Sequence, residues 1–503
     1  MKRANNGRAS IAALLLATIF GSAPAFAADL RIGLQEDPDV LDPHEARTFV
    51  GRIVFNALCD KLVDSNEKLE IIPRIATSWA FSADGKTLTM KLRGGAKFHD
   101  GTALDAAAVK ANIDRARTMQ TSRRRSELAS VASVEAPDAA TVVFNLTAPD
   151  APLLAQLSDR AGMLLSPRSF DSPIGPNPIC SGPYKFVERV QNDRIVLTRF
   201  KDHWEADKYT FDNVAFRVIT DTTVRLANLR SGQLDMIERL APSDVKSAKS
   251  DANLKVVSIA GLGYQGITIN VANGERAKTP LALDKRVRQA LSLAIDRDAI
   301  NQVVHEGLMT PSGQPFPPAS PYHDKSFPTP KRDIAKAKEL LKAAGAETVS
   351  FEMQVANSTI EQQLGQVVQA MAGEAGIDIK IKSTEFAAML KAQSAGDFQS
   401  TLLQWSGRVD PDGNIHQFAT TGGGLNDPKY SNAEVDKALN TARGIYDVAE
   451  RQKLYTAAAK ILREELPILY LFHQSWIWAI STKVSGFAPN PDGMIRLAGM
   501  KLN

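Results

Sequence analysis

The sequence contains little cysteine and histidine and lacks the motifs of common catalytic sites. It has 2 cysteines and 7 histidines among 503 residues, and no two histidines stand at the spacing that a zinc-hydrolase helix requires. A GxSxG nucleophile motif is also missing. These absences argue against metal catalysis and serine hydrolysis, and they give no reason to expect a cofactor or a resident metal.

Long apolar runs and long basic runs are missing as well. After residue 27 the most apolar segment, residues 466–480, is interrupted by Pro467, His473 and Gln474, so it predicts buried strands rather than a membrane span. Residues 28–503, which lack three of the 60 basic residues and none of the 56 acidic ones, carry 57 basic against 56 acidic residues. Neither nucleic acid nor an anionic membrane is therefore expected as a main partner.

The first 27 residues have the pattern of a cleaved secretory signal. Lys2, Arg3 and Arg8 precede the apolar residues 11–20, and the small residues of Ala25-Phe26-Ala27 mark a cleavage site. An uncleaved anchor is the alternative, but the apolar run is shorter than the roughly 20 residues needed to span a bilayer. We expect an exported mature chain from residue 28 onward that is free and soluble, since no cysteine at its start can take a lipid.

Composition and patterning predict a folded protein of several domains. The chain is 44% hydrophobic and 23% charged, as is typical of globular domains, and its length suggests about three of them. Residues 30–218 mostly alternate as short strands and turns, for example at 87–92 and 141–146, and one helix begins near Asp105. This first part is predicted to be α+β.

After Pro280 the pattern becomes α/β. A helix is expected to begin near Asp284 and to end around residues 307–318. A strand at 349–355, a helix at 360–371 and a strand at 377–381 make a strand-helix-strand unit, whose two strands should be parallel with a right-handed crossover.

The next predicted strand, residues 398–405, follows a helix at 385–395 and ends at Trp405. Open α/β sheets generally bind ligands at the carboxyl ends of their strands. The segment that follows, residues 406–430, is rich in Gly, Asp and Asn and is expected to be a long functional loop.

Two patterns with possible chemistry carry little weight. Residues 261–266 fit GxGxxG, but the alternating residues 267–271 predict a strand where a dinucleotide site needs a helix. Asp410 and Asp412 have the residue type of a general acid and base, yet paired carboxylates in loops more often hold turns or cap helices. A secreted hydrolase is thus the alternative from another functional class.

The two cysteines, Cys59 and Cys180, are an even number in a chain predicted to be exported. Oxidising compartments allow a disulfide, and two separate buried thiols are the alternative that the sequence leaves open.

Many ordered segments of the chain resemble the extracellular solute-binding proteins of peptide- and nickel-type ABC importers, family 5. The segments run from the mature start almost to the C-terminus. They are Leu41-Asp42-Pro43-His44, residues 73–79, residues 92–102, Ser181-Gly182-Pro183-Tyr184, residues 229–235, residues 287–297, Asp410-Pro411-Asp412 and residues 430–436.

The resemblance implies an α/β, two-lobed periplasmic binding protein fold of type II (cluster C-like) with an extra subdomain in the first lobe. The implied first lobe is residues 28–265, with the subdomain at about 59–178. The second lobe is residues 266–474, and residues 475–503 return to the first lobe. Because Cys59 and Cys180 both fall in the first lobe, the resemblance favours their pairing.

The function implied is that of a periplasmic substrate-binding protein, not an enzyme. It would close over a peptide or peptide-like solute and deliver it to an inner-membrane ABC permease with cytoplasmic ATPases, acting as a monomer. Closure removes the solute from water and strengthens each polar contact. Glutathione, an opine-like conjugate, a nickel chelate or haem are the alternative solutes.

The resemblance also suggests how the solute is held. Peptide-binding relatives place an acid just before the Asp-Pro pair to anchor the ligand's amino group, whereas this chain has Arg408 there. Either Asp410 takes over the ammonium, or Arg408 binds a ligand carboxylate and the solute is acidic; an exposed loop cation is the structural alternative for Arg408.

Five further residues are candidates for the cleft. Tyr264, Gln265 and Asn270 fall on the strand that crosses between the lobes, Trp405 would cover the ligand, and Ser181 keeps the hydroxyl of a family motif. Each could equally be a buried structural group.

Overall fold

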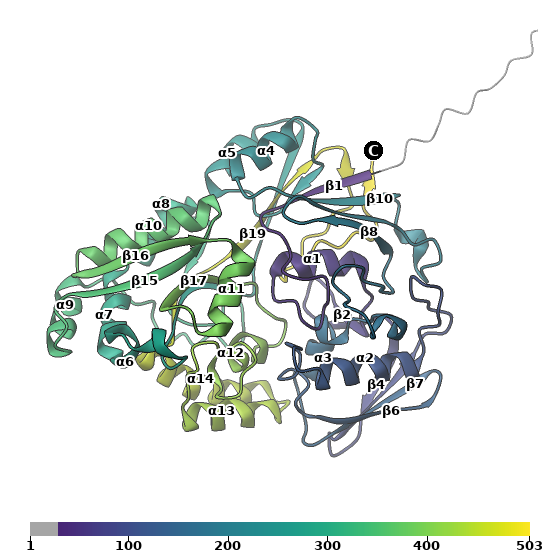
Figure 1. The fold of residues 1–503 in the computed structure, drawn as a ribbon, viewed down its shortest axis with the longest axis horizontal. Coiled ribbons are helices and arrows are strands. Elements are labelled where there is room, and N and C mark those ends of the chain that lie inside the picture. The colour runs from purple at the N-terminus through teal and green to yellow at the C-terminus, as the bar shows by residue number, and fades with distance from the viewer. Residues whose placement is uncertain (1–28) are drawn as a thin grey trace, which may run out of the picture.

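The computed structural model describes residues 29–503, so the predicted signal at 1–27 lies outside the described residues. Two lobes stand side by side (Figure 1). No helix within residues 29–503 is long and apolar enough to cross a membrane. We call residues 29–260 with 475–503 the first lobe and residues 264–473 the second lobe.

The first lobe is built on a seven-stranded sheet in the order β12-β19-β11-β1-β10-β9-β8. Strand β1 pairs in parallel with β10 and β11. Helix α1 (Phe49–Leu58) packs its apolar side against this sheet. Two helices, α4 (Thr222–Arg230) and α5 (Val245–Lys249), complete the lobe. The strands are β1 (Asp29–Leu34), β8 (Tyr184–Val190), β9 (Arg194–Arg199), β10 (Asn213–Val218), β11 (Met236–Ile237), β12 (Leu254–Ala260) and β19 (Ser475–Ser481).

The extra subdomain of the first lobe is a four-stranded antiparallel sheet with its own core, at the lower right of Figure 1. The predicted strands at 87–92 and 141–146 are confirmed as β5 and β7, and Asp105 caps α2 (Ala106–Thr118) as expected. The other elements are β2 (Val63–Ser65), β3 (Ile71–Pro73), β4 (Ala76–Phe81), β6 (Val131–Asp138) and α3 (Leu153–Leu157).

The second lobe has a six-stranded sheet in the order β14-β18-β13-β17-β15-β16. The predicted strand-helix-strand unit is confirmed as β15 (Val349–Ala356), α10 (Thr359–Gly373) and β16 (Ile377–Thr384), with β15 and β16 parallel. The remaining elements are β13 (Tyr264–Ile269), β14 (Thr310–Pro311), β17 (Ser400–Trp405), β18 (Ile468–His473), α6 (Pro280–Leu283), α9 (Ile334–Ala343) and α11 (Phe386–Ala395).

Two expectations for the second lobe need correction. The helix from Asp284 ends at Ala294 as α7 (Lys285–Ala294), and Asp296 caps a separate helix, α8 (Arg297–His305). The expected loop 406–430 contains α12 (Asp412–Ala419). Polar residues of α12 are buried, so its sequence lacks the apolar period that reveals a helix.

Two further helices, α13 (Ala433–Arg443) and α14 (Val448–Glu465), pack with α12 beside the sheet. They lie at the lower left of Figure 1, across from α3 of the subdomain. This helical group supplies the partners of both acids in the Asp410-Pro411-Asp412 motif.

The chain crosses between the lobes twice. It passes from β12 to β13 through residues 261–263 and returns from β18 to β19 through Gln474. The GxGxxG pattern at 261–266 thus runs into strand β13 and not into a helix, as predicted. Tyr264 and Gln265 belong to β13 and pair with β17 in the six-stranded sheet.

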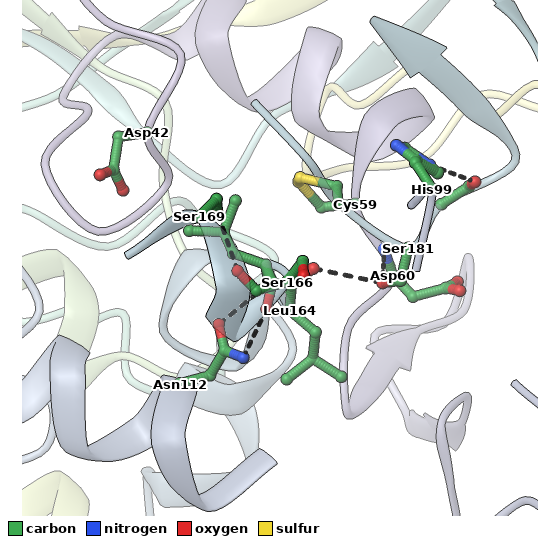
Figure 2. The surroundings of a disulfide bond; sticks show 12 residues. Asp42, Cys59, Asp60, His99, Asn112, Leu164, Ser166, Ser169 and Ser181 are labelled. Atoms are coloured by element: carbon green, nitrogen blue, oxygen red, sulfur yellow. Dashed lines mark hydrogen bonds between the residues drawn. A yellow bond between two sulfur atoms is a disulfide. The ribbon is translucent and has the colours of Figure 1, made fainter. Parts of the chain in front are cut away.

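The two cysteines form a disulfide at the C-terminal end of α1. Cys59 and Cys180 form a disulfide with their Cα atoms 4.9 Å apart. Figure 2 shows Cys59 next to Asp60 and Ser181. The bond fastens the end of α1 to the segment that leads into β8.

Candidate functional site

A cavity of about 930 Å³, including its open mouth, lies between the two lobes. The first lobe contributes residues after β1, from α1 and from the subdomain, and the second lobe contributes β17, α11 and the segment around α12. Part of the cavity wall is apolar and consists of Phe386, Leu390, Leu402, Phe418 and Leu425. Five arginines and two glutamates also line the cavity; they are Arg47, Arg124, Arg160, Arg239, Arg408, Glu36 and Glu361.

Arg160 is the cavity arginine whose charge is least compensated. Its side chain is almost fully buried, Nη1 donates to the carbonyl of Ala46, and Nε has no hydrogen-bond partner. No carboxylate of residues 29–503 lies within 4.0 Å of its guanidinium. Burial and the neighbouring charge of Arg124 lower the pKa of Arg160 well below its ordinary value, which marks an unfavourable charge, since an arginine in a protein stays protonated.

The surroundings of Arg160 are positively charged as a whole. Arg52 and Arg408 share the carboxylate of Asp159, and Arg124 pairs with Glu127. This guanidinium cluster, Arg52, Arg124, Arg160 and Arg408, thus has four positive charges against two negative ones. A buried excess of positive charge is costly unless an anion compensates it, and guanidinium groups bind carboxylates and phosphates well.

Arg408 lines the cavity, as the sequence led us to expect, but it is not an exposed loop cation. Its Nε lies 2.7 Å from Oδ2 of Asp159 in the first lobe, and its guanidinium stacks 4.2 Å from the ring centre of Trp405. Burial lowers the pKa of Arg408 to about 9, against the raising effect of Asp159. Arg408 therefore links the two lobes by an ion pair.

The position of Arg408 depends on two glycines. Gly407 has φ of +86°, and a Cβ there would lie 2.5 Å from the backbone nitrogen of Gly263. A Cβ on Gly263 would lie 1.7 Å from the carbonyl oxygen of Trp405. The turn after β17 thus packs directly against the first crossing between the lobes, which only glycine allows.

Asp410 does not line the cavity. Its two carboxylate oxygens accept hydrogen bonds from Arg451 of α14 at 2.9 and 2.7 Å. Asp412 is likewise held by Arg443 of α13. Both carboxylates face the helical group of the second lobe, so the expectation that Asp410 anchors the solute does not fit this geometry.

Trp405 has the place predicted for it. It ends β17, which pairs in parallel with β15, and it lines the cavity. Its Nε1 donates to Asn414 at 2.9 Å, and its ring meets Phe418 edge-on at 4.8 Å between centres. The indole is therefore fixed as part of the wall.

Gln265 lines a second cavity of about 550 Å³, which lies next to the segments that cross between the lobes. Gln35, Arg239, Glu361 and Gln404 line both cavities. Gln265 donates from Nε2 to the Glu361 carboxylate at 3.0 Å. This places Gln265 and Glu361 where the two cavities meet.

Three other expected residues lie outside the linings of both cavities. Tyr264 is buried between Phe418 and Tyr470, and Asn270 donates to the carbonyls of Asn273 and Phe398. Ser181 donates to the carbonyl of Leu164 and accepts from the backbone nitrogen of Asp60, beside the disulfide (Figure 2). The polar groups of Asn270 and Ser181 are thus bonded within the protein, as buried polar groups usually are, whereas the buried hydroxyl of Tyr264 has no hydrogen-bond partner within residues 29–503.

Sequence reasoning missed Arg160, Arg124 and Glu361. Asp159 and Arg160 are adjacent charged residues that interrupt the mostly apolar segment 153–165, and such an interruption of a buried segment is a signal that was available. Glu361 and Arg124 carry no such signal, because their neighbours are polar.

Comparison with known proteins identifies the family of the chain. Residues 70–426 match the family described as "Bacterial extracellular solute-binding proteins, family 5 Middle". The chain belongs to family 5 of the bacterial extracellular solute-binding proteins. This family-5 protein is 30% identical over 500 residues to the glutathione-binding protein GsiB of Pectobacterium atrosepticum, with 96% of each chain covered.

Solved structures of family-5 proteins share its fold. It superposes on AgaA of A. tumefaciens R10 in complex with agropinic acid with a TM-score of 0.86 and 26% identity, covering 94% of this chain and 99% of that one. For the murein tripeptide binding protein MppA of Escherichia coli the TM-score is 0.88 with 25% identity, covering 95% and 99%. The two-lobed periplasmic binding protein fold is thereby confirmed. Within residues 29–503, no group of three or more His, Cys, Asp and Glu side chains is placed to hold a metal ion.

Proposed function

We propose that this family-5 protein captures an acidic, peptide-like solute in the periplasm and delivers it to an inner-membrane ABC permease, without chemical turnover. The observation that carries the proposal is the uncompensated Arg160 in the wall of the cleft. A solute carboxylate at Arg160 would supply the anion that the guanidinium cluster lacks.

Binding of a solute carboxylate next to Arg160 is favoured by the electrostatics of the cavity. The cavity is enclosed by both lobes, and charge interactions strengthen where water is excluded. A carboxylate that binds only when the lobes are together also stabilises the closed form, because a ligand shifts a conformational equilibrium by its differential affinity. Binding and closure are then coupled.

The similar proteins support the same solute class. GsiB is named for glutathione, and AgaA was solved with agropinic acid; both are small solutes that carry carboxylate. A neutral dipeptide is less well supported, because Asp410 is already paired with Arg451.

Calorimetry on residues 28–503 tests the proposal. The probes are reduced glutathione, a tripeptide with an acidic side chain, and the same tripeptide with its carboxyl groups converted to amides. We expect the acidic probes to bind and Arg160→Gln to weaken them at least tenfold, with little effect on the amide. Arg168→Gln, at an exposed arginine outside the cavity, is the control. Equal losses for acidic and amide probes would contradict the proposal.

A further inference from the structure

Glu361 occupies an unusual place in the cleft. It lies in the first turn of α10 and lines both cavities, at the junction formed with Gln35, Arg239 and Gln404. A group bound there would touch the main cavity and the second cavity at once. Glu361 belongs to the second lobe, while Arg160 belongs to the first.

The carboxylate of Glu361 has no charged partner. Its hydrogen-bond partner is the Gln265 amide at 3.0 Å, and no Lys, Arg or His nitrogen of residues 29–503 lies within 4.0 Å of it. The nearby Arg239 is engaged by Glu36 and Glu238 instead. A carboxylate has about four acceptor positions, so Glu361 keeps acceptor capacity for a donor in the cavity.

The polar and charged groups that face Glu361 come from several elements. Arg239 and Glu36 approach from the first lobe, Gln265 and Gln404 from β13 and β17, and His305 lines the second cavity. Burial raises the pKa of Glu361 to about 7; Arg239 lowers it and Glu36 raises it. The ionised carboxylate is thus poorly stabilised by the protein itself, and a cation in the cavity would stabilise it.

We propose that Glu361 accepts the ammonium group of the solute, so that the cleft selects an acidic solute that also carries a free amine. This inference rests on the proposed function, in which Arg160 takes a carboxylate. It assigns the amine to a second-lobe residue on α10, and it leaves Asp410 to its ion pair with Arg451. A zwitterionic solute would then be held from both lobes at once, which ties recognition of each end to closure.

The test compares reduced glutathione with its N-acetyl derivative by calorimetry in the wild type and in three variants. We expect the wild type to prefer the free amine at least tenfold, and Glu361→Gln to reduce that preference to about one. Arg160→Gln should weaken both probes and keep the preference, and Asp410→Asn should keep it too. Circular dichroism of each variant checks that it is folded.

The outcomes separate the two proposals. If neither probe nor the acidic tripeptide binds the wild type, the proposed function fails, and the amine assignment fails with it. If glutathione binds and Glu361→Gln keeps the amine preference, or if Asp410→Asn abolishes it, the amine assignment alone is overturned.

A measurement on the wild type guards against a variant that does not fold. Burial raises the pKa of Glu361 to about 7, so the unliganded carboxyl holds part of a proton near neutral pH, and an ammonium ion would displace it. Calorimetry in two buffers of different ionisation enthalpy should therefore show more proton release with glutathione than with the N-acetyl derivative. Equal proton release for the two probes would overturn the assignment.

Discussion

Arg408 in the second lobe and Asp159 in the first lobe are joined across the cleft, with Nε 2.7 Å from Oδ2. Asp159 also binds Arg52 at 3.1 Å, and Arg52 in turn donates to Ser406 beside Arg408. The guanidinium groups of Arg408 and Arg52 outweigh burial and hold the pKa of Asp159 well below its ordinary value. Other contacts reinforce the closed form, including Arg47 with Asp427.

Because Arg408 is paired within the protein, its removal should affect closure rather than the choice of solute. We expect Arg408→Gln to weaken acidic and amide probes by the same factor. Breaking a buried pair costs about 3–5 kcal/mol when one partner is left alone, but Asp159 keeps Arg52, so the loss should be smaller. Small-angle scattering with saturating glutathione should show a larger open fraction. A selective loss for acidic probes would make Arg408 a direct ligand contact.

Asp410 and Arg451 should matter for stability and not for the solute. Their side chains are 14% and 6% exposed and form two hydrogen bonds. We expect Asp410→Asn to lower the free energy of unfolding by about 3–5 kcal/mol, measured by urea denaturation, with unchanged affinity for glutathione. A double-mutant cycle with Arg451→Gln should show strong coupling. Independent effects of the two substitutions would contradict the pairing.

The sequence predicted the fold better than the site, and particular residues show why. The strand-helix-strand unit around α10 and the strand ending at Trp405 follow from apolar periods, which depend on neighbours in the chain. Arg160 and Glu361 both line the cavity although they are about 200 residues apart in the sequence. No pattern of neighbouring residues predicts that they lie in the same cavity. Asp410 belongs to a motif of the family, but its ion-pair partner Arg451 lies 41 residues further along the chain, so the motif alone did not reveal the pairing. The helix α12 was not predicted, because polar residues on its buried face give it no apolar period.

The disulfide should stabilise the first lobe. It links residues separated by 121 positions, and loss of a native disulfide commonly costs about 2–5 kcal/mol. We expect the oxidised protein to have an intact mass two hydrogen atoms below that of the reduced one, and a reductant to lower the Tm. The Cys59→Ser/Cys180→Ser double variant serves as the control, because its Tm should not respond to reductant. A reductant effect of equal size in that variant would assign the loss to another cause.

Acidification should destabilise the protein because several histidines are buried in the neutral form. Burial lowers the pKa of His305 to about 4, and neither of its ring nitrogens has a hydrogen-bond partner within residues 29–503. Burial also lowers the pKa of four other histidines. These are His44, with a pKa of about 3, His99 and His473, each about 4, and His416. Their ordinary pKa in an unfolded chain is about 6.5. Between pH 6.5 and 4 the unfolded chain therefore binds more protons than the folded protein, so the free energy of unfolding falls as the pH falls.

Each such histidine contributes at most about 1.4 kcal/mol per pH unit. Glu361 and Asp150, whose pKa values are raised by burial to about 7 and about 6, act in the opposite direction and offset part of the loss. Burial also raises the pKa of Glu36 and Asp244, which act in the same direction as Glu361. The five histidines outnumber these four carboxyl groups, so Tm should drop between pH 7 and pH 5 at constant ionic strength. His305→Leu should reduce this dependence by up to one histidine's share, because it removes a buried group that must stay neutral. A Tm that is flat over this range, or a slope that His305→Leu leaves unchanged, would show that His305 gains a proton in the folded state as readily as in the unfolded one.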